Sequence, residues 1–209
     1  MSWLWGSKRK KVEISSPVAN PAKPSLLDSY DDYHEDIELM DDSRLFGPED
    51  PKKLSDNLPA RLYGSKWKLI YSTFRHGISS STLLRASREC GGSSILIIKD
   101  YSGYVFGAFA SHAWNNPEPK FYGNGECFLF TLHPEFKVHR WTSKNGYCQM
   151  IENNRIIMGG GSGIFGLWLD EDLLSGTTQP CETFDNGVLS HESHFKVFGI
   201  ELWGFHDDT

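Results

Sequence analysis

Ser94-Ile-Leu-Ile-Ile-Lys-Asp-Tyr-Ser-Gly-Tyr-Val-Phe-Gly-Ala-Phe-Ala110 is the stretch that decides the fold of this 209-residue chain. Residues 94–99 are short and rich in β-branched side chains, residues 100–103 are typical of a turn, and residues 104–110 are apolar again. Two such runs joined by a short turn predict a β-hairpin.

The sequence on both sides of this hairpin continues in short runs separated by turn residues. Trp67, Leu69 and Tyr71 alternate with Lys68, Ile70 and Ser72, which indicates a strand with one face better buried than the other. Ser79–Arg88 begins with serine caps and stops before Gly91, which predicts a helix, and a shorter helix is expected over Pro51–Leu58. Further strands are expected over residues 126–132, 136–141, 147–151, 155–158, 165–169 and 195–205. Many short strands without long intervening helices favour a mainly β (α+β) fold, a two-sheet antiparallel β-sandwich with a few short peripheral helices.

The charge distribution predicts a disordered tail, residues 1–50, and one folded domain, residues 51–209. The chain carries a net charge of −6; residues 1–27 contribute +4, residues 28–50 contribute −9, and −1 remains for residues 51–209. Blocks of like charge with little apolar sequence favour disorder, basic first and then acidic. The near-neutral domain lacks the basic face that phosphate binding requires, so no nucleic-acid partner is expected.

The cysteines and the N-terminus bear on localisation. Cys90, Cys127, Cys148 and Cys181 form no Cys-x-x-Cys pair, and no secretory signal pattern precedes them, so reduced thiols in a cytoplasmic or nuclear protein are expected. No apolar segment reaches the roughly twenty residues that cross a bilayer. Met1–Lys11 combines an apolar tip with a basic patch, which leaves three alternatives open: a solvated tail, a peripheral contact with an anionic organelle membrane, or a nuclear import signal.

The run Gly159-Gly-Gly-Ser-Gly163 is the most unusual local feature, with four glycines and a serine in five residues. Gly161–Gly166 fits the dinucleotide pattern G-x-G-x-x-G, but strand-like residues follow where a helix is required. Ile164 stands where a serine-hydrolase elbow needs glycine, and no Lys-Ser/Thr pair follows as in a phosphate-binding loop. Two interpretations remain: a bend between strands, or a surface that a partner's backbone approaches closely.

The side chains that could bind a metal or act in catalysis form no recognisable site. His191 and His194 stand at i and i+3 but lack further ligands, and they are interpreted as surface histidines, so no metal site is expected. Carboxylates that could act in acid/base chemistry are Glu126, Asp170, Glu171 and Asp172. Glu126 adjoins Cys127 in the sequence, and its charge is expected to raise the pKa of that thiol.

Several separated motifs in a fixed order resemble the TLDc domain, the module of oxidation-resistance proteins and their relatives. The similarity covers about residues 52–206. The motifs are Leu58–Arg61, Trp67–Thr73, Arg75–Ile78, Val105–Phe109, Phe121–Glu126, Phe128–Phe130, Gly159–Leu169, Asp172-Leu173 and Glu201–Phe205.

The resemblance implies a β-sandwich in a cytoplasmic protein that is linked to oxidative-stress resistance. It also implies binding to the vacuolar-type proton ATPase, with an effect on the assembly or activity of that pump. The leading hypothesis is a non-enzymatic interaction module that docks on the V1 sector without a cofactor. The residues predicted to bind the partner are Gly159, Gly160, Gly161, Ser162, Gly163, Glu126 and Asp170. The alternative is a stress-protective enzyme, either a hydrolase that uses Glu126 and Asp170 or a thiol peroxidase that uses Cys127.

Overall fold

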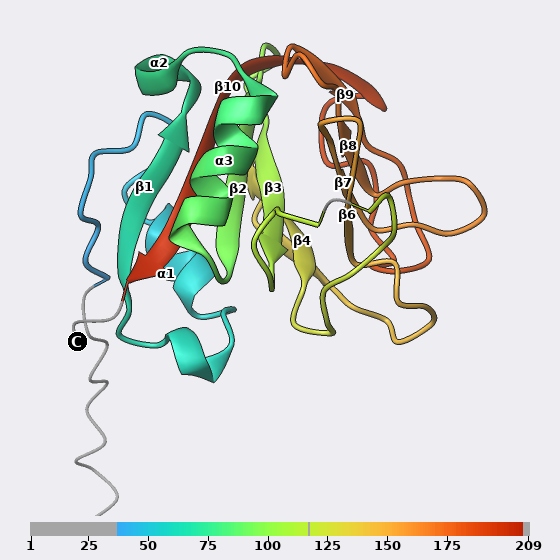
Figure 1. Cartoon of the computed structure of the whole chain (residues 1–209), viewed down its shortest axis with the longest axis horizontal. Coiled ribbons are helices and arrows are strands. Elements are labelled where there is room, and N and C mark those ends of the chain that lie inside the picture. The colour runs from blue at the N-terminus through green and yellow to red at the C-terminus, as the bar shows by residue number, and fades with distance from the viewer. Residues whose placement is uncertain (1–36, 117, 207–209) are drawn as a thin grey trace, which may run out of the picture. The chain divides into compact units, whose positions relative to one another are not determined.

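A computed structural model describes residues 37–116 and 118–206 of the chain. These residues form a mainly β structure in which all neighbouring strands of the sheet are antiparallel (Figure 1). The strands are β1 (Lys66–Ser72), β2 (Ser94–Asp100), β3 (Val105–Ala110), β4 (Phe128–His133), β5 (Lys137–Arg140), β6 (Gln149–Glu152), β7 (Arg155–Met158), β8 (Leu167–Leu169), β9 (Ser175–Thr177) and β10 (His194–His206). The helices are α1 (Asp50–Ser55), the short 3-10 helix η1 (Ala60–Leu62), α2 (Thr73–His76) and α3 (Ser80–Cys90).

The hairpin predicted at residues 94–110 is confirmed as β2 and β3. Ile97 lies opposite Gly107 in their register. A Cβ atom on Gly107 would stand 1.8 Å from the carbonyl oxygen of Leu96, so this position requires glycine. The predicted helix is confirmed as α3: the Ser79 hydroxyl accepts a hydrogen bond from the Thr82 amide at 3.2 Å, and Gly91 ends the helix with φ +68°.

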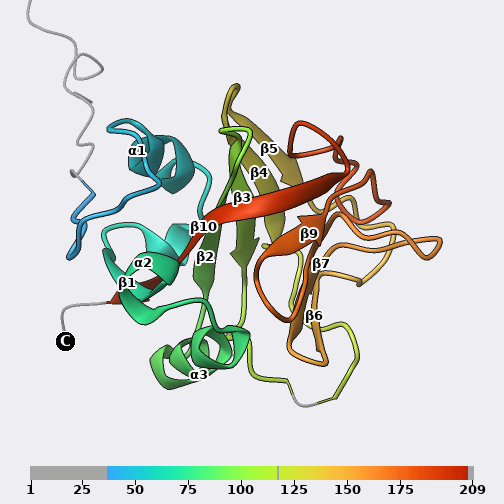
Figure 2. The same cartoon turned by 90° about the horizontal axis from the view of Figure 1, so that it is seen from above.

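The long strand β10 joins the two layers of the sandwich. Its first residues, His194–Lys196, pair with β9, whereas Val197–Gly204 pair with β2 and Glu201–His206 pair with β1. The strand order is β5-β4-β3-β2-β10-β9-β8-β7-β6, with β1 on β10 (Figure 2). The expected antiparallel sandwich is therefore built from two halves of one sheet. We call β1–β5 with the C-terminal part of β10 the first half, and β6–β9 the second half.

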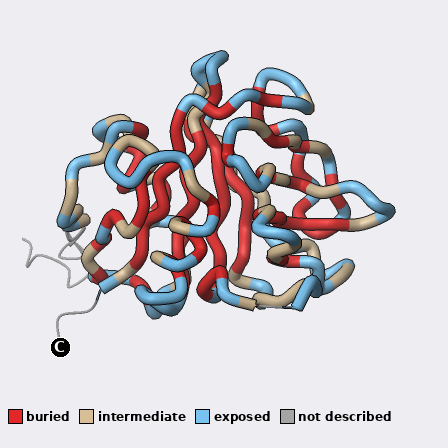
Figure 3. The backbone as a smooth tube through the Cα atoms, turned by 45° about the horizontal axis from the view of Figure 1, so that its top comes forward, coloured by how far each residue is buried: buried red, intermediate tan, exposed pale blue. Residues whose placement is uncertain are grey.

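Two hydrophobic clusters fill the space on either side of the first half. One lies between the halves and joins Leu96 and Phe106 to Ile156 and Leu169 of the second half. The other lies on the opposite face of the first half, where Trp67 and Trp203 pack with α1 through Leu54. Residues 95–98 of β2 are all apolar, as expected of a strand that is buried on both faces (Figure 3).

Described residues N-terminal to Pro51 belong to the packed unit. Glu38 and Met40 form backbone hydrogen bonds with Trp67 at 2.9 Å. The carboxylate of Glu201, only 1 % exposed, accepts hydrogen bonds from the Ser43 hydroxyl at 2.6 Å and the Arg44 amide at 2.8 Å. The packed domain thus extends upstream of the boundary expected at residue 51. The remainder of the predicted tail, including Met1–Lys11, lies outside the described residues.

Within the described residues, no helix has the length and apolar character that a membrane span needs.

Candidate functional site

The glycine loop, residues 159–163, connects β7 to the segment that leads into β8, and its first two residues are buried. Gly159 has φ +72°, and a Cβ atom there would stand 2.7 Å from both Cys181 Sγ and Phe184 Cδ2. The amide of Gly160 donates a hydrogen bond to the Thr183 hydroxyl at 2.9 Å, and its carbonyl accepts one from the same hydroxyl at 2.9 Å. This part of the loop is therefore held by internal contacts and requires glycine for steric reasons.

The second part of the loop faces solvent. Ser162 has φ +54°, and its hydroxyl donates a hydrogen bond to Glu182 at 2.8 Å. Gly163 is exposed, has φ +77°, and a Cβ atom there would have no neighbour within 4 Å. The Ile164 amide donates to the Gly161 carbonyl at 2.9 Å and closes the turn. Of the five loop residues, those at positions 161–163 are the ones that an approaching molecule can reach.

Glu126 lies at the end of the segment before β4 and forms an ion pair with Arg61 at 2.7 Å. Hydrogen bonds from the Arg61 guanidinium hold the pKa of this carboxyl below its ordinary value. The neighbouring Gly125 packs against the ring of Trp141, whose indole donates a hydrogen bond to the carbonyl of Asn145. Glu126 thus stays ionised next to a cation, an arrangement that suits a surface contact better than proton transfer at neutral pH.

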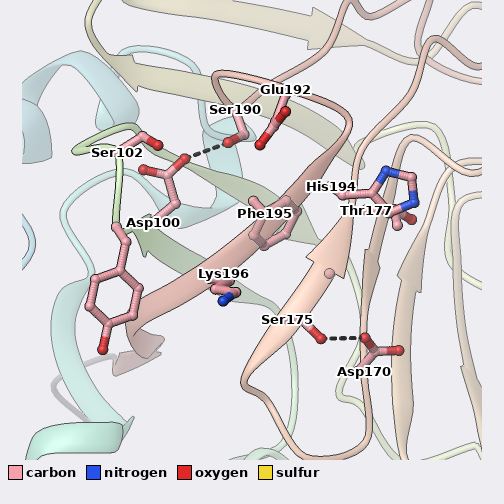
Figure 4. A pocket seen from close by; sticks show the side chains of 12 residues that line it. Asp100, Ser102, Asp170, Ser175, Thr177, Ser190, Glu192, His194, Phe195 and Lys196 are labelled. Carbon is pink, nitrogen blue, oxygen red and sulfur yellow. Dashed lines mark hydrogen bonds between the residues drawn. The ribbon is translucent and has the colours of Figure 1, made fainter.

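Asp170 follows β8 and lines a pocket of about 440 Å³ at the start of β10 (Figure 4). Its carboxylate accepts hydrogen bonds from the Ser175 hydroxyl at 2.7 Å and from the Trp168 indole at 3.1 Å. Across the pocket, the buried Asp100 accepts a hydrogen bond from the Ser190 hydroxyl. Asp170 thus links the end of β8 to the start of β9, and Asp100 links the end of β2 to the loop before β10.

The sites predicted at Glu126, Asp170 and the glycine loop have different hydrogen-bond partners. Glu126 is bonded to Arg61, Asp170 to residues of β8 and β9, and the loop to Thr183 and Glu182. A hydrolase that uses Glu126 with Asp170 would need the two carboxylates to act on one bond, and no contact among the described residues joins them.

Cys127 and Cys148 form a buried thiol pair that sequence reasoning missed. The Cys127 amide and the Cys148 thiol both donate to the Asn124 carbonyl, at 3.2 and 3.3 Å. The neighbouring Cys148 thiol and a hydrogen bond from the Ser111 amide at 3.4 Å lower the pKa of Cys127 to about 6, and the same interaction between the two thiols raises the pKa of Cys148.

The expectation that Glu126 raises the pKa of Cys127 is therefore wrong. Glu126 is turned towards solvent and Arg61, whereas Cys127 is 1 % exposed and packs in the core. The two thiols are 21 residues apart in the sequence, and no local pattern marks them as neighbours.

His191 and His194 are both exposed, and Tyr104 packs edge-on against the His191 ring at 5.9 Å. Over residues 37–116 and 118–206, no group of three or more His, Cys, Asp or Glu side chains is placed to hold a metal ion.

Comparison with known proteins agrees with the motifs. Nuclear receptor coactivator 7 of Homo sapiens is 38% identical over 198 residues, which is 94% of this chain and 21% of that protein. Oxidation resistance protein 1 of Rattus norvegicus is 39% identical over 195 residues, 93% of this chain and 23% of that protein. Oxidation resistance protein 1 of Homo sapiens is 41% identical over 167 residues, 80% of this chain and 19% of that protein.

The chain spans about a fifth of the length of these curated relatives. The family model described as the TLDc domain matches residues 39–206, which includes the residues at positions 39–50 that pack on β1 and β10. The chain belongs to the TLDc domain family.

Proposed function

We propose that this chain is a non-enzymatic interaction module that binds the V1 sector of the vacuolar-type proton ATPase in the cytoplasm and changes the assembly or activity of the pump. The observation that carries the proposal is membership of the TLDc family, with oxidation resistance protein 1 among the relatives. The proposed outcome is increased resistance of the cell to oxidative stress.

The fold supports a binding role because it fixes the first residues of a loop whose tip is exposed. Gly160 is anchored by two hydrogen bonds to the buried Thr183, and the Gly159 amide donates a hydrogen bond to the Cys148 carbonyl at 2.9 Å, while Ser162 and Gly163 are exposed. Anchoring of this kind lowers the conformational entropy that a loop loses when a partner binds.

A binder changes pump assembly only if its affinity differs between the assembled and the free V1 sector. A tenfold preference shifts the equilibrium between these states by about 1.4 kcal/mol. The direction of the shift follows from which state binds more tightly.

The test uses the full chain with purified V1 and with the assembled pump. Binding is measured by co-sedimentation with each form, and ATP hydrolysis is measured with and without the chain. We expect binding that differs between the two forms and a matching change in coupled proton transport. Absence of binding to both forms would remove the proposal.

A second candidate function is thiol peroxidase activity at Cys127, whose pKa is lowered beside Cys148. Because the two thiols are only 1% and 2% exposed, this activity requires a local opening of the core that admits the peroxide. In this reaction the Cys127 thiolate attacks the peroxide O–O bond, which forms a sulfenic acid and releases water after protonation of the leaving oxygen. The Cys148 thiol then attacks the sulfenic sulfur, forming a disulfide and a second water, and an external thiol reductant returns the pair to the reduced state.

The peroxidase test compares wild type, Cys127→Ser and the control Cys90→Ser, because Cys90 is an exposed free cysteine outside the thiol pair. Peroxide consumption that disappears only in Cys127→Ser supports this function. Consumption that is absent in wild type, or equal in all three proteins, rejects it.

A further inference from the structure

A row of aromatic rings runs from the glycine loop to Asp170 along the second half of the sheet. The ring centroids of Tyr147 and Phe121 are 4.9 Å apart, those of Phe121 and Phe165 are 6.4 Å apart, and those of Phe165 and Trp168 are 5.1 Å apart. Gly160 lies beneath the first pair, because a Cβ atom there would stand 3.1 Å from Phe121 and 3.2 Å from Tyr147. We call these four rings the aromatic face.

Strand alternation explains why this row lies outside the core. Leu167 and Leu169 of β8 pack in the cluster between the two halves, so Trp168 points to the opposite side. Ile157, its neighbour across the β7–β8 pair, is fully buried yet belongs to neither core cluster. The outer side of the second half therefore carries an apolar layer of its own.

This layer is only partly covered. Tyr147 is 46% exposed and Ile164, next to Phe165, is 38% exposed. Exposed aromatic and aliphatic side chains that form a contiguous surface mark interaction sites more often than scattered ones do.

Carboxylates lie at both ends of the aromatic face. Asp170 is bonded to the Trp168 indole, Glu171 pairs with Arg155 at 3.0 Å, and Glu182 is bonded to the glycine loop. The guanidinium of Arg155 lies 5.8 Å from the centroid of the Trp168 ring. The chain itself thus places a cation against this face.

The charge of this region contrasts with that of the first half. Residues 51–140 contain twelve basic and six acidic residues. Residues 141–186 contain two basic residues, Lys144 and Arg155, and six acidic residues, Glu152, Asp170, Glu171, Asp172, Glu182 and Asp185. An acidic rim around aromatic rings is complementary to a segment with Lys and Arg side chains, and it disfavours phosphate-bearing ligands.

We propose that the aromatic face is the surface that docks on the pump, and that it receives a basic protein segment whose Lys or Arg side chains stack on the rings and pair with the rim carboxylates. This inference rests on the proposed function. It adds the site on this chain and the chemistry of the partner segment. The tip of the glycine loop, residues 161–163, forms one end of the docking surface.

The experiment measures the affinity of purified V1 for the full chain in two matched charge-reversal variants. The first, Glu171→Lys with Glu182→Lys, changes exposed carboxylates on the rim. The control, Glu89→Lys with Glu135→Lys, makes the same change in net charge at exposed positions outside the second half. A third variant, Tyr147→Ala, removes an exposed ring without changing charge.

We expect the rim variant to weaken binding by about tenfold or more at low salt, with the difference shrinking between about 50 and about 300 mM salt as screening increases. The control should stay within about twofold of wild type, and Tyr147→Ala should weaken binding at every salt concentration, because ring contacts are not screened. Circular dichroism and thermal unfolding check whether each variant is folded. If the rim variant is unfolded, the affinity of Tyr147→Ala for V1 tests the proposal by itself.

The outcomes separate the two proposals. If wild type binds V1 and neither the rim variant nor Tyr147→Ala differs from it, the aromatic face is not the docking surface while the proposed function stands. The same conclusion follows if only the control variant loses affinity. If wild type does not bind V1, the proposed function and the docking surface both fall.

Discussion

Two glycines of the same loop provide a direct test of how the loop is built. Gly159 and Gly163 have nearly equal backbone angles, φ +72° and +77°. An alanine at either position pays about 1 to 2 kcal/mol for the left-handed conformation. Only at Gly159 would the new methyl also overlap Cys181 and Phe184, and overpacking of a core adds about 1 to 3 kcal/mol. We therefore expect losses of about 2 to 5 kcal/mol for Gly159→Ala and about 1 to 2 kcal/mol for Gly163→Ala.

Urea unfolding followed by tryptophan fluorescence measures both losses against wild type. Because domains of this size are stable by about 5 to 15 kcal/mol, Gly159→Ala should shift the midpoint strongly. Equal losses in the two variants would show that backbone angle alone decides both positions and would refute the steric argument. A Gly159→Ala protein as stable as wild type would refute both parts of the reasoning.

Three further predictions concern groups outside the glycine loop. Glu201→Ala leaves the Ser43 hydroxyl, the Arg44 amide and the Trp203 indole without their acceptor, so it should lower the free energy of unfolding by about 1 to 3 kcal/mol in urea titrations. Glu201→Gln keeps an acceptor oxygen and should lower it less. Arg61→Gln removes the cation that lowers the pKa of Glu126, so this pKa should rise towards its ordinary value in an NMR titration, and an unchanged pKa would contradict the assignment of its cause. The pKa of Cys127 in the folded protein lies at about 6, below that of an unfolded thiol at roughly 8.5. The free energy of unfolding of wild type, measured by urea titration, should therefore increase as the pH rises between these two values, and Cys148→Ala should lose most of that increase.

Local signals account for the parts of the fold that could be predicted. The β2–β3 hairpin follows from two apolar runs and a four-residue turn, and α3 follows from the Ser79 cap and the glycine stop. Each of these signals lies within a few residues of the element that it specifies. Elements of this kind can be read from the sequence without knowledge of the rest of the chain.

Features that depend on distant partners could not be predicted. Strand β9 has three residues and contains Gly176, and its conformation depends on close packing beneath Phe195 and the Trp168 carbonyl. Division of β10 between the two halves is likewise a matter of pairing partners rather than of its own composition. The thiol pair was missed for the same reason, because Cys148 reaches Cys127 only after the sheet has formed.

The predicted binding residues include some that the core constrains and others that are open to solvent. Gly159 is constrained from within by Cys181 and Phe184, so a substitution there would disturb the loop and the core together. Loss of V1 binding in that variant would therefore not identify a contact.

Gly163 has open space around it, so a side chain there meets no neighbouring atom of the domain and, apart from the cost of its backbone angle, can affect only what approaches from outside. If Gly163→Ala and Gly163→Asp are folded to the same extent but differ in affinity for V1, the difference reports on the approaching surface. Because the proposed partner segment is basic, Gly163→Asp should bind more tightly than Gly163→Lys at low salt. The reverse order would show that the surface facing this end of the aromatic face is acidic.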